Sequence, residues 1–419
     1  MKKIVILSVF LQINISYLAS FILIPMGEDN QSNHLKAYGI AYWILQNDIE
    51  VDWLLNYQGG SFLIKNNSSI QEECTIRGVS FNILTNSKVA QIKSNIANPE
   101  VNQEIVRLEK APKIAVYTPK GKQPWDDAVT LVLSYAEIPY EEIYDKEIIK
   151  NELFKYEWLH LHHEDFTGQY GKFYRNYRNA AWYMQQQKNA EQSAKELGFN
   201  KVSELKLQVG KSIKEFIAGG GFLFTMCSGT DSYDIAMSAE NTDICEYMFD
   251  GDKADPSAQS KLNYNKTLAF KDFKLKSNPM VYEFSDIDGT MLHNLPENQD
   301  LFTLFDFSAK WDIVPTLLCQ NHTRIIKGFM GQTTDFKSSL IKSNVLVMGE
   351  SKVFGTARYI HGEYGKGQWT FYGGHDPEDY RHYVNDPPTD LNLYPNSPGY
   401  RLILNNILFP AAKKKKQKT

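Results

Sequence analysis

Short apolar runs and amphipathic helical stretches alternate from residue 113 onward, and this alternation constrains the fold more than any other feature of the sequence. Apolar runs of four or five residues, bounded by polar or glycine-rich segments, are typical of buried strands. The expected strands are 114–117, 142–144, 158–162 and 222–226, and the expected helices are 126–136, 148–154 and 205–217. Right-handed crossovers that join parallel strands through helices explain such a pattern. The sequence therefore predicts an α/β fold with a mostly parallel sheet and helices on both faces.

The final third of the chain is expected to add strands to this sheet. The candidates are 280–284, 313–318, 345–348 and a hairpin-like pair at 357–360 and 368–372. A polar and aromatic insertion at 173–197 is predicted to be helical and only partly buried.

A small α/β unit is expected ahead of the main domain. Its predicted strands are 21–25, 51–55 and 62–64, and its helix carries Leu35, Tyr38, Ala41 and Leu45 on one face after the cap candidates Asp29, Asn30 and Ser32. The next stretch, rich in Asn, Ser and Gln, predicts a helical or irregular connection that ends near Pro112. The predicted units are therefore 21–111 and 112–412, with a leader at 1–20 and a solvated basic tail at 413–419.

The amino terminus has the order of a secretory signal. Lys2 and Lys3 precede the apolar run 4–11, and weaker apolar sequence continues to the small residue Ser20. We therefore expect export to the periplasm or the medium, with cleavage after Ser20. Without cleavage, the apolar run continues to Ile24 and is long enough to span a bilayer.

Charge and cysteine spacing exclude several classes of protein. The formal net charge is only −4 over 419 residues, and no basic stripe interleaved with aromatic residues is present, so we expect no nucleic-acid partner. The four cysteines lack CxxC spacing, which argues against a zinc knuckle or a thioredoxin-type motif. Because export permits disulfides, a bridge between Cys227 and Cys245 stays open as an alternative.

The segment 222–230, Phe-Leu-Phe-Thr-Met-Cys-Ser-Gly-Thr, gives the sharpest functional signal. It places Cys227 at a tight turn between a buried strand and a helix, which is the geometry of a nucleophile elbow. The positive end of the helix is expected to lower the pKa of the thiol. The N–H groups of Ser228 and Gly229 would face a developing oxyanion. A buried core cysteine is the plain alternative.

A second segment supplies the partners that a thiol nucleophile needs. After the expected strand 368–372 come two glycines, His375, Asp376, Pro377 and Glu378. An imidazole can take the thiol proton, and a carboxylate can orient the imidazole. The sequence therefore predicts His375 as the base and Glu378 or Asp376 as its orienting group, against the alternative of an ordinary loop histidine.

Together these two segments resemble the class I glutamine amidotransferase-like superfamily, including its ThuA-like relatives. In that family, alternating strands and helices lead to a cysteine elbow, and a late strand leads to a histidine and an acidic residue. The resemblance covers residues 112–412 and implies a flavodoxin-like sheet, with Cys227 as nucleophile and His375 as base.

The chain departs from the family pattern at two positions. Thr225 stands where the elbow commonly has its first glycine, and Asp376 separates His375 from the Pro-Glu pair that commonly follows it directly. These departures argue against glutaminase activity in particular and affect the expected fold less.

A third cluster, at residues 160–165, follows the expected strand 158–162. Ligands of open α/β sheets bind at the carboxyl ends of the strands. We expect His162, His163, Glu164 and Asp165 to contact substrate or to make structural hydrogen bonds, and the resemblance implies a second oxyanion donor at Gly168 or a neighbour. A divalent metal held by His160, His162 and Glu164 is the weaker alternative, and no cofactor is expected.

Two local motifs offer other functions. Residues 286–290, Asp-Ile-Asp-Gly-Thr, resemble the phosphoryl-accepting motif of haloacid dehalogenases, although that motif normally opens its domain. Residues 228–232, Ser-Gly-Thr-Asp-Ser, resemble a shortened pyrophosphate loop of asparagine synthetases. Both alternatives are disfavoured, and ordinary turn chemistry explains the first equally well.

The sequence thus predicts an exported thiol-dependent hydrolase or amidase that acts on a small molecule with an acyl or amide group. The alternative is a catalytically silent protein on the same fold that binds a ligand or a partner. Neither the substrate nor the oligomeric state follows from the sequence.

Overall fold

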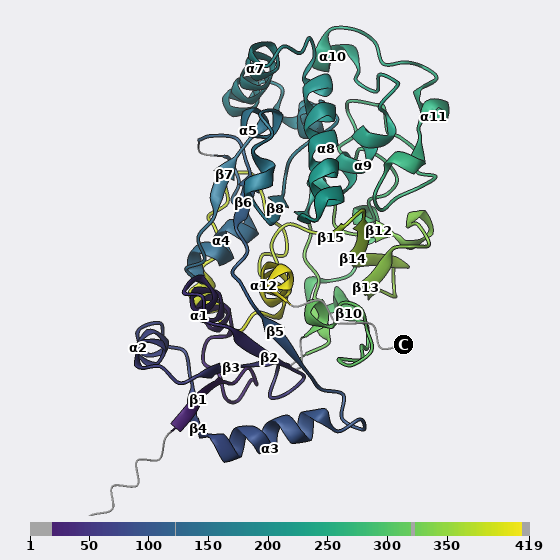
Figure 1. The fold of residues 1–419 in the computed structure, drawn as a ribbon. Coiled ribbons are helices and arrows are strands. Elements are labelled where there is room, and N and C mark those ends of the chain that lie inside the picture. Colours follow the sequence, from purple (N-terminus) through teal and green to yellow (C-terminus); the bar gives the residue numbers. More distant parts are fainter. Residues whose placement is uncertain (1–18, 122, 320–322, 413–419) are drawn as a thin grey trace, which may run out of the picture.

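Two β-sheets and the helices packed on them make up the chain, which is an α/β protein (Figure 1). The computed structural model describes residues 19–121, 123–319 and 323–412. The strands of the smaller sheet lie between residues 19 and 108, and those of the larger sheet between residues 114 and 372.

The N-terminal sheet has five strands in the order β4-β1-β3-β2-β5, and every neighbouring pair is antiparallel. Its elements are β1 (Ala19–Ile24), α1 (His34–Gln46), β2 (Val51–Leu55), β3 (Ser61–Lys65), α2 (Ser68–Ile76), β4 (Asn82–Thr85), α3 (Asn86–Ala97) and β5 (Glu104–Leu108). The three expected strands and the helix are present, although Asn33 rather than an earlier residue caps α1. The helical form of the expected connection is confirmed by α2 and α3, but the sequence analysis missed both edge strands, β4 and β5.

The parallel half of the large sheet has the strand order β7-β6-β8-β9-β15. Its strands are β6 (Ile114–Tyr117), β7 (Glu141–Ile143), β8 (Trp158–Leu161), β9 (Phe222–Met226) and β15 (Gly367–Tyr372). Between them lie α4 (Ala128–Tyr135), α5 (Asp145–Ile149), α6 (Tyr174–Tyr177), α7 (Ala181–Glu196), α8 (Val202–Gly219), α9 (Ser228–Ser238), α10 (Tyr247–Asp250) and α11 (Ala258–Lys261). The alternating pattern from residue 113 to 226 therefore predicted these strands within one residue at each end.

The other half of the sheet is antiparallel, so the prediction of a mostly parallel sheet is correct for only five of ten strands. Its strands are β10 (Leu301–Leu304), β11 (Ile325–Lys327), β12 (Phe336–Lys337), β13 (Leu346–Ser351) and β14 (Thr356–Tyr364). Two predicted strands are absent: 280–284 is irregular chain, and 313–318 ends in the 3-10 helix η6 (Pro315–Leu318). Neither run pairs in the sheet: Phe284, Leu317 and Leu318 are buried, whereas Met280, Tyr282 and Ile313 are exposed.

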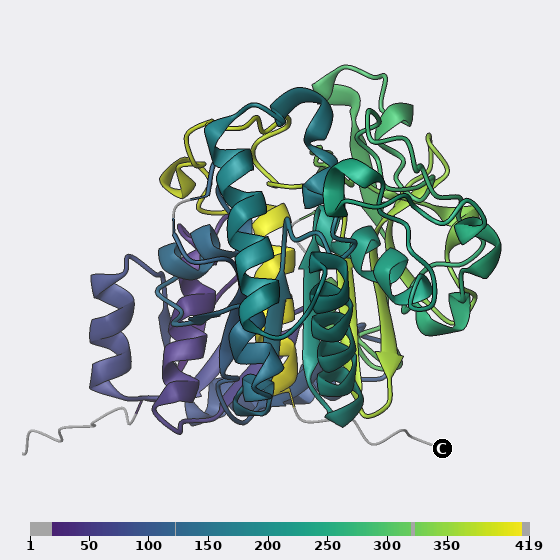
Figure 2. The ribbon, with the colours of Figure 1, turned by 90° about the horizontal axis from the view of Figure 1, so that it is seen from above.

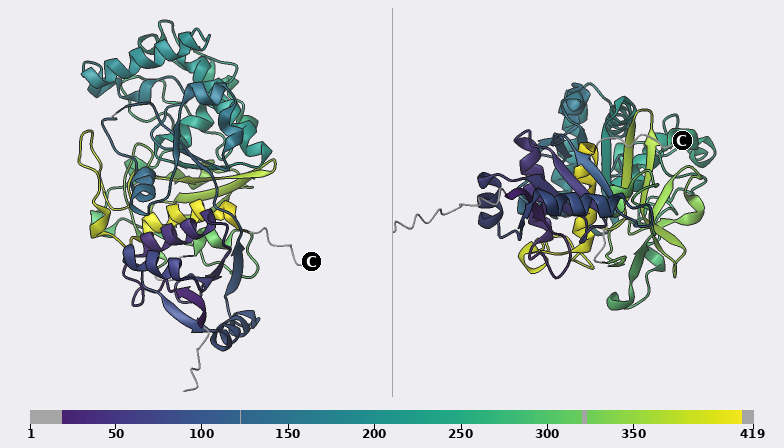
Figure 3. Two further views of the ribbon diagram at one scale, coloured as in Figure 1. Left: turned by 60° about the vertical axis from the view of Figure 1, so that its left-hand side comes forward. Right: turned by 60° about the horizontal axis from the view of Figure 1, so that its bottom comes forward.

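Helices cover both faces of the parallel strands, as expected (Figure 2). Alternation along β6 sends Ile114 and Val116 into one core with α1, α4 and α12 (Pro398–Leu408), and Ala115 and Tyr117 into a second core with α5, α8 and α9. The C-terminal helix α12 lies between the large sheet and the N-terminal unit (Figure 3).

Close helix packing ties the N-terminal unit to this layer. Gly39 of α1 approaches the end of α4 so closely that an added Cβ would lie 1.8 Å from the carbonyl oxygen of Ala136. On α12, the buried Arg401 donates hydrogen bonds to the hydroxyl of Tyr38 and the carbonyl of Gly59. The two predicted units therefore share one continuous core.

The predicted signal segment lies mostly outside the described residues, and export stays a prediction. Cleavage after Ser20 would fall inside β1 and would leave Phe21–Ile24 to pair with β3. Within the part of the chain that the structure describes, no helix combines the length and apolarity needed to cross a membrane.

Candidate active site

The carboxyl ends of four neighbouring parallel strands meet around one cavity. Tight turns or loops after β6, β8, β9 and β15 bring their next residues to this edge of the sheet. The cavity has a volume of about 310 Å³. Its lining consists of Trp125, His163, Phe173, Cys227, Tyr282, Met330, Gly331, Gln332, His375, Arg381, His382, Tyr383 and Val384. Cys227 and His375, which the sequence paired across a long separation, therefore share one cavity.

Cys227 occupies a strained turn between β9 and α9. Its φ of 51° and ψ of −140° are unusual for a residue with a side chain, and such strain gathers at functional sites. The turn is held by two backbone hydrogen bonds: the N–H of Cys227 donates to Gly374 at 3.2 Å, and the N–H of Gly229 donates to His162 at 2.8 Å. All four cysteines are described and free, so the alternative of a bridge to Cys245 is not realised.

Backbone N–H groups surround the sulfur of Cys227. The N–H of Gln332 donates to Sγ at 3.3 Å, and the N–H groups of Ser228 and Thr333 also point at it. Ser228 therefore lies where the sequence predicted. The N–H of Gly229 instead donates to the carbonyl oxygen of His162, directly after β8. Gly168, the other expected donor, packs against Ser203 of α8 and does not line the cavity.

The thiol of Cys227 is buried, with 3% of the residue exposed. Burial raises its pKa to about 11, although three backbone N–H groups act in the opposite direction. The prediction of a lowered pKa is therefore wrong. The helix terminus is a local effect, and the loss of hydration outweighs it. The resting group is therefore a protonated thiol.

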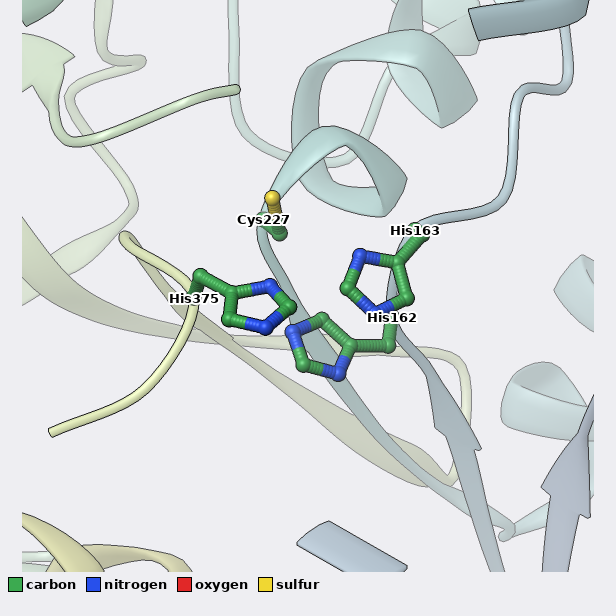
Figure 4. Close-up of side chains that lie close together, drawn as sticks. All are labelled: His162, His163, Cys227 and His375. Atoms are coloured by element: carbon green, nitrogen blue, oxygen red, sulfur yellow. The ribbon is translucent and has the colours of Figure 1, made fainter. Parts of the chain in front are cut away.

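Three histidines stand beside Cys227, as Figure 4 shows. His162 and His163 follow β8, and His375 follows β15. The rings of His162 and His163 stack with centroids 3.8 Å apart, and the ring of His375 is tilted against that of His163 at 4.6 Å. One ring nitrogen of each histidine and the sulfur all lie within 4.8 Å of one another. We refer to these four residues as the cysteine–histidine cluster.

Two carboxylates from the loop before α4 stand behind the imidazoles. An oxygen of Asp126 lies 3.6 Å from Nε2 of His375 and 2.9 Å from Nε2 of His382. Asp127 lies 3.1 Å from Nδ1 of His162 and also caps α4. Burial opposes ionisation of both carboxyls, but the neighbouring imidazoles outweigh it and hold the pKa of each below its usual range.

The predicted orienting carboxylates, Asp376 and Glu378, are turned away from the ring of His375. Asp376 is buried, accepts a hydrogen bond from the N–H of Glu378 and faces Tyr400. Glu378 approaches Ser397 and Lys327. Burial raises the pKa of both. Proximity in sequence suggested them, but the chain turns after His375, so Asp126 takes the place assigned to them.

The imidazoles of the cluster are held in the neutral form. Burial lowers the pKa of His162 to about 4 and that of His163 well below its usual range. Burial also lowers the pKa of His375, and Asp126 offsets this only in part. In contrast, Asp126 and Asp379 overcome burial and raise the pKa of His382 to about 9.

The other predicted residues of the 160–165 segment have structural partners. His160 lies 3.0 Å from Asp127, outside the cavity. Glu164 contacts the hydroxyl of Tyr144 and lies 3.8 Å from Lys206, while burial raises its pKa to about 7. Asp165 accepts hydrogen bonds that order the loop from Thr167 to Gly171. A metal site that includes Glu164 is therefore wrong.

Several site residues were not predicted. Trp125, Asp126 and Asp127 follow the first parallel strand, so their position at the carboxyl edge was available from the topology. His382 follows the predicted histidine segment by a few residues. Gln332 had no local signal, because its loop reaches the sulfur only through tertiary packing.

The two motifs that suggested other functions, at residues 286–290 and 228–232, stabilise a loop of this site. The irregular segment around Asp288 is tied by hydrogen bonds to Thr290 and Thr334. At the start of α9, Asp231 is buried and accepts a hydrogen bond from Thr333. Both carboxylates hold the loop that carries Gln332.

Comparison with known proteins leaves the family open. No protein-family model matches the chain, and no curated protein matches it. Two solved cytoplasmic proteins of Salmonella typhimurium align over 72% of this chain and 100% of their own, at 10% and 11% identity and a TM-score of 0.35. A β-galactosidase from Bacillus circulans sp. alkalophilus aligns over 74% of this chain and 33% of its own, at 12% identity and a TM-score of 0.26. TM-scores this low carry no argument about fold or activity.

Proposed function

We propose that this protein is a thiol-dependent hydrolase or acyltransferase that acts on a small molecule with an ester or amide group. One observation carries the proposal: the sulfur of Cys227 stands on a cavity, within reach of an imidazole and below converging N–H groups. Nucleophile, base and oxyanion donors are the three parts that acyl transfer needs.

The reaction would begin with the neutral form of each group. His375 takes the proton from Sγ as the sulfur attacks the substrate carbonyl, and Asp126 orients and stabilises the imidazolium that results. The N–H groups of Ser228, Gln332 and Thr333 stabilise the developing oxyanion. The imidazolium then protonates the leaving group, and water releases the acyl group from sulfur with His375 again as the base.

The class I glutamine amidotransferase-like superfamily is our proposal for the origin of this site. Numbered along the chain, the parallel strands have the spatial order 2-1-3-4-5, which is the order of flavodoxin-like sheets. The elbow after the fourth strand and the histidine after the fifth support the same proposal. The extra antiparallel strands would then be an addition to that core.

A trapping experiment tests the activity without a known substrate. p-Nitrophenyl acetate is incubated with the full chain and a chelator, and intact-mass spectrometry follows acetylation while absorbance follows p-nitrophenolate. We expect one acetyl group on Cys227, abolished in Cys227→Ala and retained in Cys245→Ser, which removes another buried thiol. Acetylation that persists in Cys227→Ala, or an unreactive wild type, would contradict the proposal.

The aromatic lining favours a second function, which is ligand binding without chemistry. Trp125 and Phe173 pack at 5.4 Å between centroids and line the cavity together with Tyr282. Flat aromatic walls suit a sugar ring or an aromatic ligand. Tryptophan fluorescence that changes on adding a ligand library, combined with no acetylation of Cys227, would favour this alternative.

A further inference from the structure

The cysteine–histidine cluster has the composition of a soft-metal site. It joins one sulfur and three imidazole nitrogens from His162, His163 and His375, all within 4.8 Å of one another. Thiolate and imidazole donors together select zinc-like divalent ions over magnesium or calcium. We propose that the cluster binds one zinc-class transition-metal ion through these four residues.

The outer contacts of the histidines match those of metal ligands. In metal sites, the second ring nitrogen of a ligating histidine usually faces a carboxylate or a backbone carbonyl. Here His162 faces Asp127 at 3.1 Å, His163 contacts the carbonyl oxygen of Asp126 at 2.8 Å, and His375 faces the Asp126 carboxylate at 3.6 Å. The remaining nitrogen of each ring is thus available to the cluster.

A buried polar atom without a partner provides independent support. Nε2 of His162 has no hydrogen-bond partner, although the residue is only 2% exposed. Such an atom is costly unless something binds it. Tetrahedral zinc places nitrogen and sulfur donors about 3.3–3.7 Å apart, so the donor atoms would move closer together, and the stacked rings of His162 and His163 would tilt, as the cluster closes around an ion.

A second group of potential ligands, which contains another cysteine, is already occupied by a lysine. Cys245 lies with Asp243 and Asp250, but the ammonium group of Lys201 stands 2.6 Å and 3.0 Å from those two carboxylates. The carboxylates near the cluster, Asp126 and Asp127, act as outer partners and carry charge that compensates the cation.

Metal binding and acyl transfer would compete for the same sulfur. On binding, the Sγ–H bond of Cys227 breaks, the proton leaves to the buffer, and the sulfur electron pair enters the bond to the metal. A coordinated thiolate is no longer free to attack a carbonyl. The metal-bound chain is therefore the inactive form of the enzyme, although the metal inference itself does not depend on the proposed activity.

Cobalt spectroscopy of the full chain tests the site. Co²⁺ added to metal-free protein should produce a near-ultraviolet thiolate-to-cobalt band, and equilibrium dialysis should give one Zn²⁺ per chain. The band should vanish in Cys227→Ser and persist in Cys245→Ser. Asp127→Asn, which leaves the four ligands in place, should weaken zinc binding about 10- to 100-fold. Circular dichroism verifies that each variant is folded.

The outcomes separate the two proposals. A wild type without the cobalt band, or a band that survives in Cys227→Ser, overturns the metal site. Acetylation of Cys227 in chelator without any cobalt band leaves the thiol enzyme and removes the metal. A cobalt band in a protein that never becomes acetylated supports the metal site and contradicts the thiol enzyme.

Discussion

Two buried histidine clusters in the described part of the chain differ in whether their ring nitrogens have partners. In the His293 cluster, formed by His293, Asp300 and Asp335, each ring nitrogen has its own carboxylate, at 2.6 Å and 2.7 Å. In the cysteine–histidine cluster, Nε2 of His162 has no partner, and the rings of His163 and His375 line a cavity. Paired ring nitrogens hold an imidazole in one orientation, whereas an unpaired nitrogen beside a cavity can still bind a ligand from outside the chain.

Removal of the proposed base should give the largest effect on chemistry. His375→Ala leaves the thiol of Cys227 without a proton acceptor, so we expect acetylation by p-nitrophenyl acetate to fall about 10²- to 10⁴-fold. Stopped-flow release of p-nitrophenolate measures the rate. His361→Gln is the matched control, since this buried histidine bonds to Thr370 away from the cavity. An equal loss in both variants would mean that the effect comes from packing.

The His293 cluster should show the opposite behaviour. His293→Ala leaves Asp300 and Asp335 buried without their cationic partner, and breaking a buried pair in this way costs about 3–5 kcal/mol. Urea denaturation should show that loss in the free energy of unfolding. Acetylation under native conditions should change little. If His293→Ala is as stable as the wild type, or if His375→Ala is equally destabilised, the contrast between the clusters fails.

Loop packing beside Cys227 should give an intermediate effect. In Gly331→Ala, the added Cβ would stand 2.9 Å from the backbone N of His375 and 3.1 Å from Sγ of Cys227. Overpacking of this kind costs about 1–3 kcal/mol and would displace the neighbouring N–H of Gln332 from the sulfur. We expect slower acetylation together with a lower melting temperature.

Gly219→Ala is the control for this change. Gly219 is exposed, ends α8 and has nothing within 4 Å of the position a Cβ would take. Alanine at position 219 should leave the acetylation rate and the melting temperature near the wild-type values. A Gly331→Ala protein with unchanged acetylation would show that the loop does not hold the oxyanion donors.

Sequence reasoning worked where a property depends on local pattern and failed where it depends on tertiary packing. The strands of the parallel half follow from their apolar runs, and the convergence of Cys227 and His375 follows from the common edge at which those strands end. The carboxylate partner was assigned by nearness in sequence, and Asp126 reaches His375 from a different loop. The pKa of Cys227 was argued from one helix terminus, while burial by several elements decides its direction.

The antiparallel half of the sheet shows the same limit. The runs 280–284 and 313–318 have the composition of strands, but neither pairs in the sheet: the carboxyl-terminal residues of each run pack on the core, and Met280, Tyr282 and Ile313 are exposed. No local signal separates an apolar run that packs on a core from one that pairs in a sheet.

The smallest predicted effect is the pH dependence of the stability that the His293 cluster provides. Burial lowers the pKa of His293, but hydrogen bonds to Asp300 and Asp335 outweigh burial and the nearby Arg358, so its net shift is upward. A raised folded-state pKa gives stability that is complete below the unfolded value of about 6.5 and is lost as pH rises through the folded value. The stability advantage of the wild type over His293→Gln should therefore shrink as pH increases from neutral to alkaline. Urea midpoints of the wild type and His293→Gln measured across that pH range would test this prediction. A stability advantage of the wild type that grows with pH would mean that the imidazole of His293 is buried in the neutral form, like the imidazoles of the cysteine–histidine cluster.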